Sequence, residues 1–458
     1  MRPSHRCAVT MLVLASIYSI LCSSAALSSS SITQNEDSGF LKFEISDVYV
    51  GNLTHTIEVT NDASARVKGG KLFVPLITNV TARQYVILYD VYASNRVQSE
   101  ILEDDFGNIY AFWDGIEIGR EQNFSVRISY HVLSFNTHYL INSSLVASYD
   151  RSSYLYMKHT KPEKLIESDR EEIVSTAQNI VGNETNPHKK VLKIYDFVTE
   201  YMHYMAQDEE MGALWALENK TGDCSEYSYL LVALCRATEI PARIQAGFAF
   251  HSFSENTEDG HMWAEYYLED YGWIPVDATW RLFDTFDNRH FSSIQSTPEV
   301  IPYANYVFNC TSGQAEDEQR VSIAPCSASV FEDDSFAEDI GKTVSEIKRA
   351  KFAIFLGKVF GAPLIFPYEA ESVKQEFLEC EVYLQNAVEL WNRQPQLAHS
   401  SITTALDSAE ATLENAWMLI AKVFAILLSV PIAILLVALV LLRRCQVKEK
   451  AQAEVSFT

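Results

Sequence analysis

The sequence contains none of the short motifs that mark the commonest metal, nucleotide and dinucleotide sites. It has no CxxC pair, no HExxH, no P-loop and no GxGxxG, and no internal repeat is visible. Positive charge is scarce as well: 36 Lys and Arg stand against 60 Asp and Glu, which gives a formal net charge of −24. Because such a chain repels phosphate groups, we expect no nucleic-acid partner. We also expect no cofactor, and the sequence leaves calcium dependence open.

Cysteine is rare, with 8 residues in 458. Three of them lie in or next to apolar segments at the two ends of the chain, and an odd number remains between these segments. At least one of the remaining thiols must therefore be unpaired. Cys310 and Cys326 stand in a loop-like stretch, which favours a disulfide between them, although their spacing alone does not establish it. The others are Cys224, Cys235 and Cys380.

The first apolar segment is typical of a secretory signal. Residues 1–26 combine early arginines, an apolar run and small residues, with a cleavage site after Ala26. An uncleaved anchor helix is the alternative.

The second apolar segment predicts a transmembrane helix over residues 417–442. Its portion 423–442 carries no charge and is long enough to cross a bilayer as a helix. Arg443 and Arg444 follow at once, so the positive-inside rule places the tail 443–458 in the cytoplasm. We therefore expect a single-pass protein of the cell membrane whose other domains are extracellular.

Asn-x-Ser/Thr sequons support an exported surface, although such tripeptides also arise by chance. All of them fall between the two apolar segments. The candidate glycosylation sites are Asn52, Asn79, Asn123, Asn142, Asn183, Asn219 and Asn309. A glycan at Asn219 would stand close to Cys224 in the sequence and would narrow access to it.

The hydrophobic pattern changes along the chain and predicts an α+β protein of several parts. Residues 40–156 alternate apolar and polar positions between turn residues, which indicates an antiparallel β-sandwich. Residues 162–306 begin with helical periodicity and continue as strands, which indicates an α+β domain. The chain then becomes acidic and irregular, until helical patterns over 335–416 indicate a stalk that leads into the membrane helix.

Within the α+β domain, "TGDCSEYSYLLVALCRA" places two thiols in different surroundings. If Cys224 opens a helix, Asp223 and Glu226 occupy the positions of a capping box. A thiol in the first helical turn faces the positive end of the helix dipole, which stabilises a thiolate. Cys235 lies deeper in the same helix on its leucine-rich side, so we expect it to be a packing residue.

A reactive thiol needs a base, and the base needs a group that orients it. His261 begins one predicted strand, and Asp277 ends the next one after a turn. A hairpin of these strands would place the imidazole between the carboxylate and the thiol. The three residues therefore predict a Cys–His–Asp catalytic site.

The blocks that carry these residues resemble the transglutaminase-like superfamily. The resemblance rests on "GDCSEYSYLLVALCRATEIPARIQAGF" followed by "HMWAEYYLEDYGWIPVDATW", and it covers residues 162–286. Ala278 stands where a proline is common in the family, and Ser225 stands where an acidic residue is frequent. The resemblance implies a papain-like core in which Cys224 is the nucleophile, His261 the base and Asp277 the orienting carboxylate.

The resemblance further implies acyl transfer on protein amides through a thioester at Cys224. Water would give a cysteine peptidase, which we favour, and a lysine amine would give a cross-linking transamidase. The partner would be an extracellular protein or peptide substrate. Trp215 is a candidate substrate-binding residue, with core packing as its alternative role. A non-catalytic surface protein that binds or spaces other molecules is the competing function.

Overall fold

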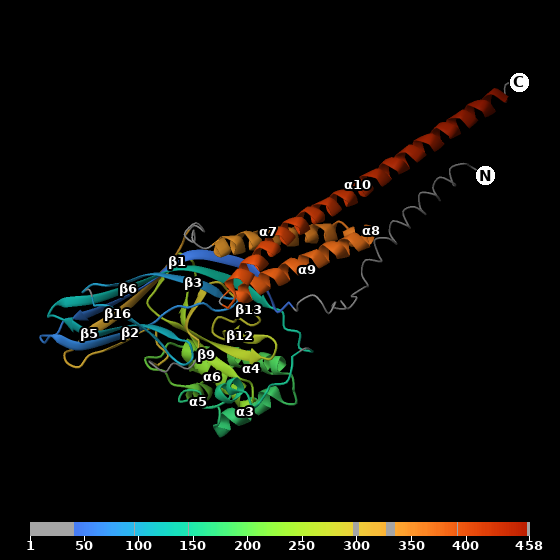
Figure 1. The fold of residues 1–458 in the computed structure, drawn as a ribbon. Helices are drawn as coiled ribbons and strands as arrows, with labels where there is room; N and C mark the ends of the chain where they lie inside the picture. Colours follow the sequence, from blue (N-terminus) through green and yellow to red (C-terminus); the bar gives the residue numbers. More distant parts are fainter. Residues whose placement is uncertain are drawn as a thin grey trace. The chain divides into compact units, whose positions relative to one another are not determined.

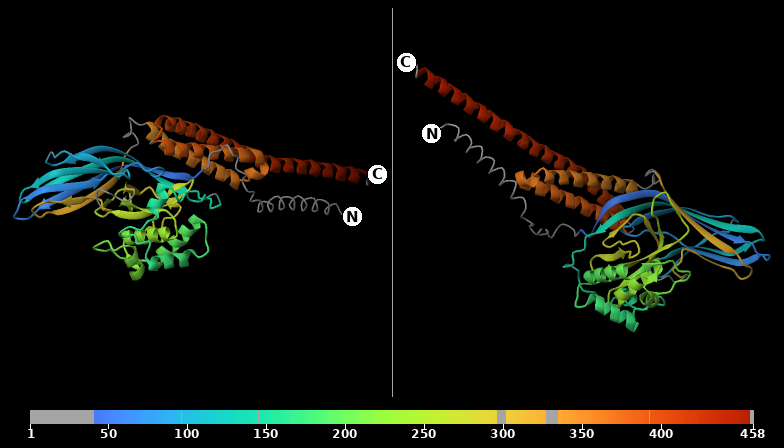
Figure 2. Two further views of the ribbon diagram at one scale, coloured as in Figure 1. Left: turned by 60° about the horizontal axis from the view of Figure 1, so that its bottom comes forward. Right: turned by 180° about the vertical axis from the view of Figure 1, so that it is seen from behind.

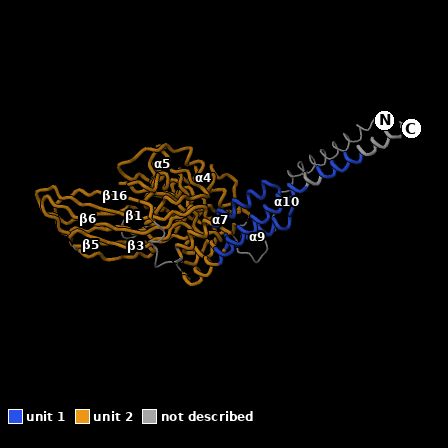
Figure 3. The backbone as a smooth tube through the Cα atoms, turned by 90° about the horizontal axis from the view of Figure 1, so that it is seen from above, with its two compact units in different colours: residues 1–40, 346–382, 404–458 blue, residues 41–345, 383–403 orange. Residues whose placement is uncertain are grey.

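The computed structural model describes residues 41–95, 97–144, 146–295, 302–326, 335–391 and 393–455. The predicted signal segment, residues 1–26, lies outside this part of the chain. The described residues form two compact units (Figure 3). The larger comprises residues 41–345 and 383–403, and the smaller contains residues 346–382 and 404–458. The larger unit holds both the N-terminal sheets and the predicted triad.

Two antiparallel sheets fill the N-terminal part of the larger unit (Figure 1). In the first, the order is β10, β16, β1, β6, β13, and β3 also pairs with β6; in the second it is β15, β2, β5, β4. Alternate apolar residues of both sheets meet in one core, which confirms the predicted β-sandwich. Its first strands are β1 (Phe43–Asn61), β2 (Val67–Pro75), β3 (Gln84–Ala93), β4 (Glu100–Glu103), β5 (Ile109–Ile118) and β6 (Gln122–Tyr139).

Strands from later in the sequence complete these sheets and add to the predicted range 40–156. The longest, β16 (Glu316–Pro325), pairs with β1 along its whole length. Its region is predicted to be irregular, but only Val321 and Ile323 of this strand are buried, so its apolar alternation is too short to indicate a strand. The shorter ones are β10 (Asn256–Thr257), β13 (Thr285–Phe286) and β15 (Val307–Asn309).

An α+β core follows the sandwich, in agreement with the predicted fold class. Its sheet has the order β12, β11, β9, β14, and α6 is almost wholly buried against it. The strands are β9 (Ala242–Ala249), β11 (His261–Leu268), β12 (Gly272–Val276) and β14 (His290–Ile294). The helices are α2 (Tyr154–His159), α3 (Glu171–Val181), α4 (Pro187–Tyr201), α5 (Ala213–Asn219) and α6 (Cys224–Ala237).

A buried ion pair connects the sandwich to the α+β core inside the larger unit. Arg83 Nη1 and Glu265 Oε1, the latter on β11, are 3.1 Å apart, and both side chains are almost completely shielded from solvent. Arg243 and Gln245 of β9 also bind the Glu265 carboxylate. Burial of an ion pair is tolerated when further hydrogen bonds satisfy its charges, as they do for Glu265.

The C-terminal helices are α7 (Ser335–Val359), α8 (Ala362–Ile365), α9 (Pro367–Leu390) and α10 (Pro395–Val455), which agrees with the helical region predicted for 335–416. In the smaller unit, the parts of α7, α9 and α10 lie side by side (Figure 2). Cys380 of α9 is fully buried, as expected of a packing residue. Within Pro395–Arg444, α10 is long and apolar enough to cross a membrane, and it enters the charge-free run at 423–442 without a break.

Candidate active site

Cys224 is the first residue of α6, and local hydrogen bonds fix the start of the helix at this position. Asp223 Oδ1 accepts from the Ser225 N–H at 2.9 Å, and Glu226 Oε2 accepts from the Asp223 N–H at 3.0 Å, which completes the predicted capping box. Gly222 has a φ of +155°, and a Cβ there would meet the side chain of Glu226. Glycine therefore lets the chain enter the cap closely, and the Cys224 side chain remains partly exposed.

The three residues of the predicted triad lie together. His261 begins β11, and Asp277 directly follows β12, its antiparallel partner. A hydrogen bond of 2.7 Å joins His261 Nε2 to Asp277 Oδ2, and the Cys224 side chain lies close enough to His261 to raise the pKa of the imidazole. Asp277 and His261 are 1% and 9% exposed. The chain of three polar groups thus leads from the interior to the partly exposed thiol.

The backbone after β12 holds the Asp277 carboxylate in place. Asp277 Oδ1 accepts from the N–H groups of Thr279 and Trp280 at 2.8 and 2.9 Å. The turn is closed by backbone hydrogen bonds between Asp277 and Leu282. Because Oδ1 is engaged in this way, Oδ2 is the oxygen that faces the imidazole.

A second histidine, His290 of β14, shares that same oxygen and is absent from our sequence prediction. Its Nε2 lies 3.2 Å from Asp277 Oδ2, and its Nδ1 lies 2.7 Å from Asp287 Oδ1. Pairing of β9 with both β11 and β14 brings His290 close to His261. In the sequence, the only local sign of this contact is that Asp287 stands three residues before His290. That His290 lies beside the triad follows only from the order of the strands.

These contacts set the charges of the site. Burial lowers the pKa of His261, but the charge and hydrogen bond of Asp277, together with the Cys224 side chain, raise it to about 9. Burial raises the pKa of Asp277, but His261 and His290 outweigh this and hold it well below its usual range. The pKa of His290 is raised as well, because its bonds to Asp277 and Asp287 outweigh burial. At neutral pH the site therefore contains an ionised Asp277 and a protonated His261.

His261, Asp277 and His290 are also a group that could hold a metal ion. Their possible ligand atoms lie within 4.8 Å of one another, and all three side chains are buried. The same atoms bond to each other through Asp277 Oδ2. In the structure, these atoms are thus already joined by hydrogen bonds through which a proton can be held.

Aromatic side chains lie around the imidazole. The ring of Trp280 lies 5.4 Å from that of His261, and the ring of Trp263 lies 5.9 Å from it. Trp215 is half-buried on α5, where its carbonyl accepts from Asn219. Its role in substrate binding stays a prediction.

An exposed apolar rim flanks Cys224. Tyr204 ends β7 (His203–Tyr204), which pairs with β8 (Thr221–Gly222), the strand that leads into α6. Burial raises the pKa of Tyr204, and the nearby Cys224 and Asp223 raise it further. Tyr204 and its neighbour Met205 are 63% and 52% exposed. These two side chains offer a substrate an apolar surface beside the thiol.

The predicted disulfide between Cys310 and Cys326 is wrong, because both residues have free thiols. The extended strand β16 separates them: Cys310 precedes it, and Cys326 follows its far end. A ten-residue strand spans roughly 30 Å, whereas a disulfide requires Cα atoms within about 7 Å. Cys235 is fully buried on α6, and burial raises the pKa of its thiol, as expected of a packing residue.

The sequons differ in exposure. Asn52 and Asn79 are half-buried, and their side-chain oxygens are hydrogen-bonded to His131 and Val86. The other predicted glycosylation sites are on the surface, and they are Asn123, Asn142, Asn183, Asn219 and Asn309. Glycosylation at the exposed group stays a prediction.

Comparison with known proteins agrees with the resemblance seen in the sequence. The sequence model of the transglutaminase-like superfamily matches residues 174–278, which include all three residues of the triad. The chain therefore contains a transglutaminase-like core. The match ends well short of the sandwich and the C-terminal helices.

Several bacterial proteins are similar over this core. An uncharacterised protein of Haemophilus influenzae is 32% identical over 123 residues, which is 22% of this chain and 33% of that protein. A protein-glutamine gamma-glutamyltransferase of Pseudomonas aeruginosa is 31% identical over 72 residues, 14% of this chain and 11% of its own. The chain thus spans a third or less of the length of these relatives.

A solved structure from Cytophaga hutchinsonii, described provisionally as a cysteine protease, is similar to this chain. It is 18% identical with a TM-score of 0.49, and the likeness covers 62% of this chain and 93% of the other.

Proposed function

We propose that the transglutaminase-like core acts as a thiol enzyme on protein amides, in a protein anchored to the cell membrane with its sandwich and core outside. One observation carries the proposal: His261 is hydrogen-bonded to Asp277, and the Cys224 side chain lies beside the same imidazole. A nucleophile, a base and an orienting group in this order are what covalent acyl transfer requires.

In the proposed reaction, the Cys224 sulfur attacks the carbonyl carbon of an amide and forms a thioester. The His261 proton passes to the departing amine. The backbone N–H of Cys224 stabilises the oxyanion, since first-turn N–H groups have no partner within their helix. Asp277 keeps the imidazole oriented and stabilises its positive charge. Water then attacks the thioester, returns a proton to His261 and releases the acid.

Hydrolysis is the outcome we favour, and transamidation is the alternative. The Pseudomonas aeruginosa relative supports the alternative, because it is named a protein-glutamine gamma-glutamyltransferase, although only a small region of it matches this chain. Both reactions use the same thioester and differ only in whether water or an amine resolves it. The substrate is in either case an extracellular protein or peptide that lies across the rim formed by Tyr204 and Met205.

The test incubates the purified full chain in detergent with casein and a fluorescent primary amine. We expect casein fragments without amine incorporation, and no product with Cys224→Ala. Incorporation of the amine into intact casein would instead establish the transamidase. If neither product forms, and an amide probe that reacts with thiols leaves Cys224 of the folded protein unlabelled, the enzyme proposal fails and a binding role takes its place.

A further inference from the structure

The tip of the helical hairpin in the smaller unit has a composition unlike that of the rest of the chain. Residues 347–368, here called the hairpin tip, include the end of α7, all of α8 and the start of α9. The tip contains no Asp or Glu, although the whole chain has a net charge of −24. Its charged residues are Lys348, Arg349, Lys351 and Lys358, and Arg349 is ion-paired at 2.6 Å with Glu346, which directly precedes the tip. The tip is thus locally basic in an acidic protein, and its cationic side chains are suited to a surface that carries phosphate groups.

The hairpin tip also leaves large apolar side chains exposed. Phe352 and Phe355 are both 58% exposed, and Val359 is 60% exposed. Their spacing places them along one side of α7. Leu364, on α8, is 59% exposed as well. Large apolar side chains exposed in one short segment mark a site of contact with a protein or a membrane.

Contacts within the smaller unit place the hairpin tip beside the start of the charge-free run. The rings of Phe360 and Phe424 lie 4.7 Å apart. A Cβ added to Gly357 of α7 would lie 3.6 Å from Ile420 of α10. Since 423–442 is the run that would enter the bilayer, the hairpin tip lies at the level where α10 meets the membrane surface.

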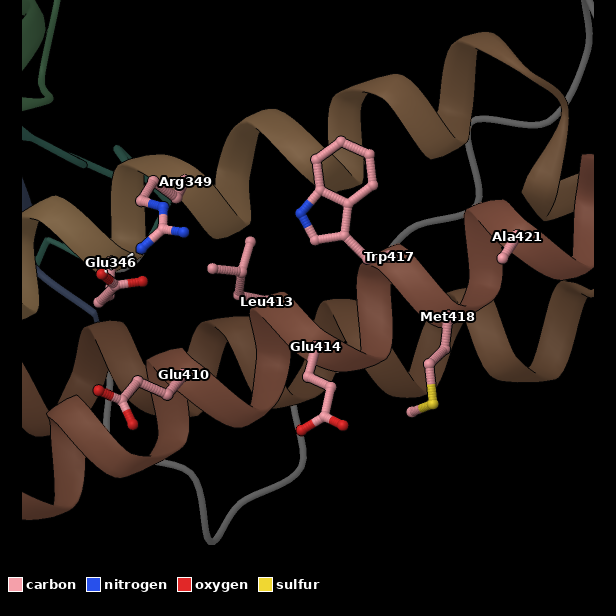
Figure 4. A pocket seen from close by; sticks show the side chains of 8 residues that line it. All are labelled: Glu346, Arg349, Glu410, Leu413, Glu414, Trp417, Met418 and Ala421. Atoms are coloured by element: carbon pink, nitrogen blue, oxygen red, sulfur yellow. Dashed lines mark hydrogen bonds and ion pairs between the residues drawn. The ribbon is translucent and has the colours of Figure 1, made fainter.

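The adjoining stretch of α10 has the features of a membrane boundary. Figure 4 shows α7 and α10 side by side, with Trp417 and Met418 on α10. The groove that these side chains line has a volume of about 590 Å³. These two side chains are 47% and 49% exposed. Tryptophan is enriched where a helix passes the headgroup layer. The groove is lined by Glu346, Arg349, Glu410, Leu413, Glu414, Trp417, Met418 and Ala421.

We propose that the hairpin tip is a second membrane contact, which lies in the interface of the bilayer that α10 enters. Phe352, Phe355, Val359 and Leu364 enter the boundary between headgroups and acyl chains, and the basic residues meet the lipid phosphates. Long Lys and Arg side chains can bury their stems there while their charges stay at the headgroups. The proposal rests on the membrane anchor proposed above, because α10 brings the tip to the surface.

The test reconstitutes the full chain in vesicles of phosphatidylcholine, labels it with a lipid-soluble diazirine and maps the label by mass spectrometry. We expect label on 434–442 and on 352–364, with none on 371–382 of α9.

The double variant Phe355→Asp with Val359→Asp should reduce label on 352–364 to the level of 371–382. Both side chains are exposed, so the bundle should fold, and label on 434–442 should persist. The matched control is Leu397→Asp, at an exposed leucine of α10 far from the charge-free run, which should change nothing. Label on 434–442 without label on 352–364 in the unsubstituted chain would overturn the hairpin proposal alone. Absence of label from both segments would remove the anchor and the hairpin proposal together.

Discussion

Single residues decide the chemistry of this site, and the central one is Asp277. Its Oδ1 is held by two backbone N–H groups, while its Oδ2 is shared by His261 and His290. A buried carboxylate with this many donors stays ionised. His261 is consequently protonated over most of the pH range in which proteins are folded. This charge arrangement leads to two predictions that separate the roles of the two histidines.

The first prediction concerns the alkaline limit of activity. Because Asp277 raises the pKa of His261 to about 9, hydrolysis should be sustained as pH rises and should decline through about pH 9. Asp277→Asn removes the charge but leaves the burial, so the pKa of His261 falls and the alkaline limb moves to lower pH. We expect kcat to fall on the order of 10²–10⁴-fold, the usual contribution of acid–base catalysis. A pH–rate profile of both proteins checks this, with His138→Gln as a control at an exposed histidine. An unchanged alkaline limb in Asp277→Asn would contradict the assignment.

The same shift affects stability. The pKa of His261 is higher in the folded chain than its ordinary value of 6.5, so its interactions stabilise the fold fully below that value. This contribution is lost as pH rises from about 6.5 to about 9.

The second prediction treats His290 as a positioning residue. His290→Gln keeps a donor toward Asp277 but cannot take up a proton, whereas His290→Ala also lacks the donor. Since His290 lowers the pKa of Asp277, its removal should raise that pKa and move the acid limb of the profile to higher pH. We expect His290→Ala to reduce kcat on the order of ten- to a hundredfold, the usual range for a hydrogen bond to a charged group, with little change in KM. Partial recovery in His290→Gln, with the acid limb still displaced, supports the role; an unaltered acid limb in both variants counts against it.

At the scale of elements, the start of α6 matters most, because it determines where the thiol points. Ser228 Oγ lies within hydrogen-bond distance of the carbonyl oxygens of Cys224 and Met262, at 2.7 and 3.1 Å. The first turn of α6 is thereby tied to β11 beside His261. The helix cap and the β11–β12 hairpin together align the thiol, the imidazole and the carboxylate.

The third prediction tests this cap. Asp223→Ala removes the acceptor of the Ser225 N–H and should lower the free energy of unfolding by about 1 kcal/mol. Because the first turn frays, labelling of Cys224 by an amide probe should also lose its pH dependence on His261. Asp223→Asn retains a side-chain acceptor and is the matched control. Its free energy of unfolding should be close to that of the unsubstituted protein. Denaturant titration in detergent measures the difference, and equal loss in both variants would rule out the capping role.

At the scale of the whole molecule, the sandwich and the α+β core belong to one unit rather than two separate domains. Arg83 contacts Glu265 and also lies over the ring of Phe286, at 4.2 Å. Two hydrogen bonds between the Gln84 side-chain amide and the Ser292 backbone add to this connection. The sandwich thus supports the sheet that carries His261.

The fourth prediction follows from that buried connection. Arg83→Met should cost about 3 kcal/mol, at the low end for a broken buried pair, because Arg243 and Gln245 still bind Glu265. Arg66→Met breaks an exposed pair with Glu117 and should cost less than about 1 kcal/mol. Tryptophan fluorescence and protection of Cys224 should report one common transition in denaturant. Two separate transitions in the unsubstituted protein would mean that the sandwich and the core unfold independently.

The sequence by itself determined the features that depend on neighbouring residues. The capping box of Asp223 and Glu226 fixes the helix start at Cys224, and a turn after β11 returns the chain so that Asp277 can meet His261. The uncharged run at 423–442 likewise fixes a helix long enough to cross a membrane. Each rests on backbone geometry and hydrophobic periodicity that act over a few residues, so a local pattern is sufficient.

Only the tertiary structure decided which distant segments meet. It placed His290 on Asp277 through the pairing of β14 with β9. It also paired β16 with β1, which separates Cys310 from Cys326 and leaves both thiols free. The physical reason is common to both: strand order and register are determined by burial across the whole sheet, and sequence spacing carries no record of it.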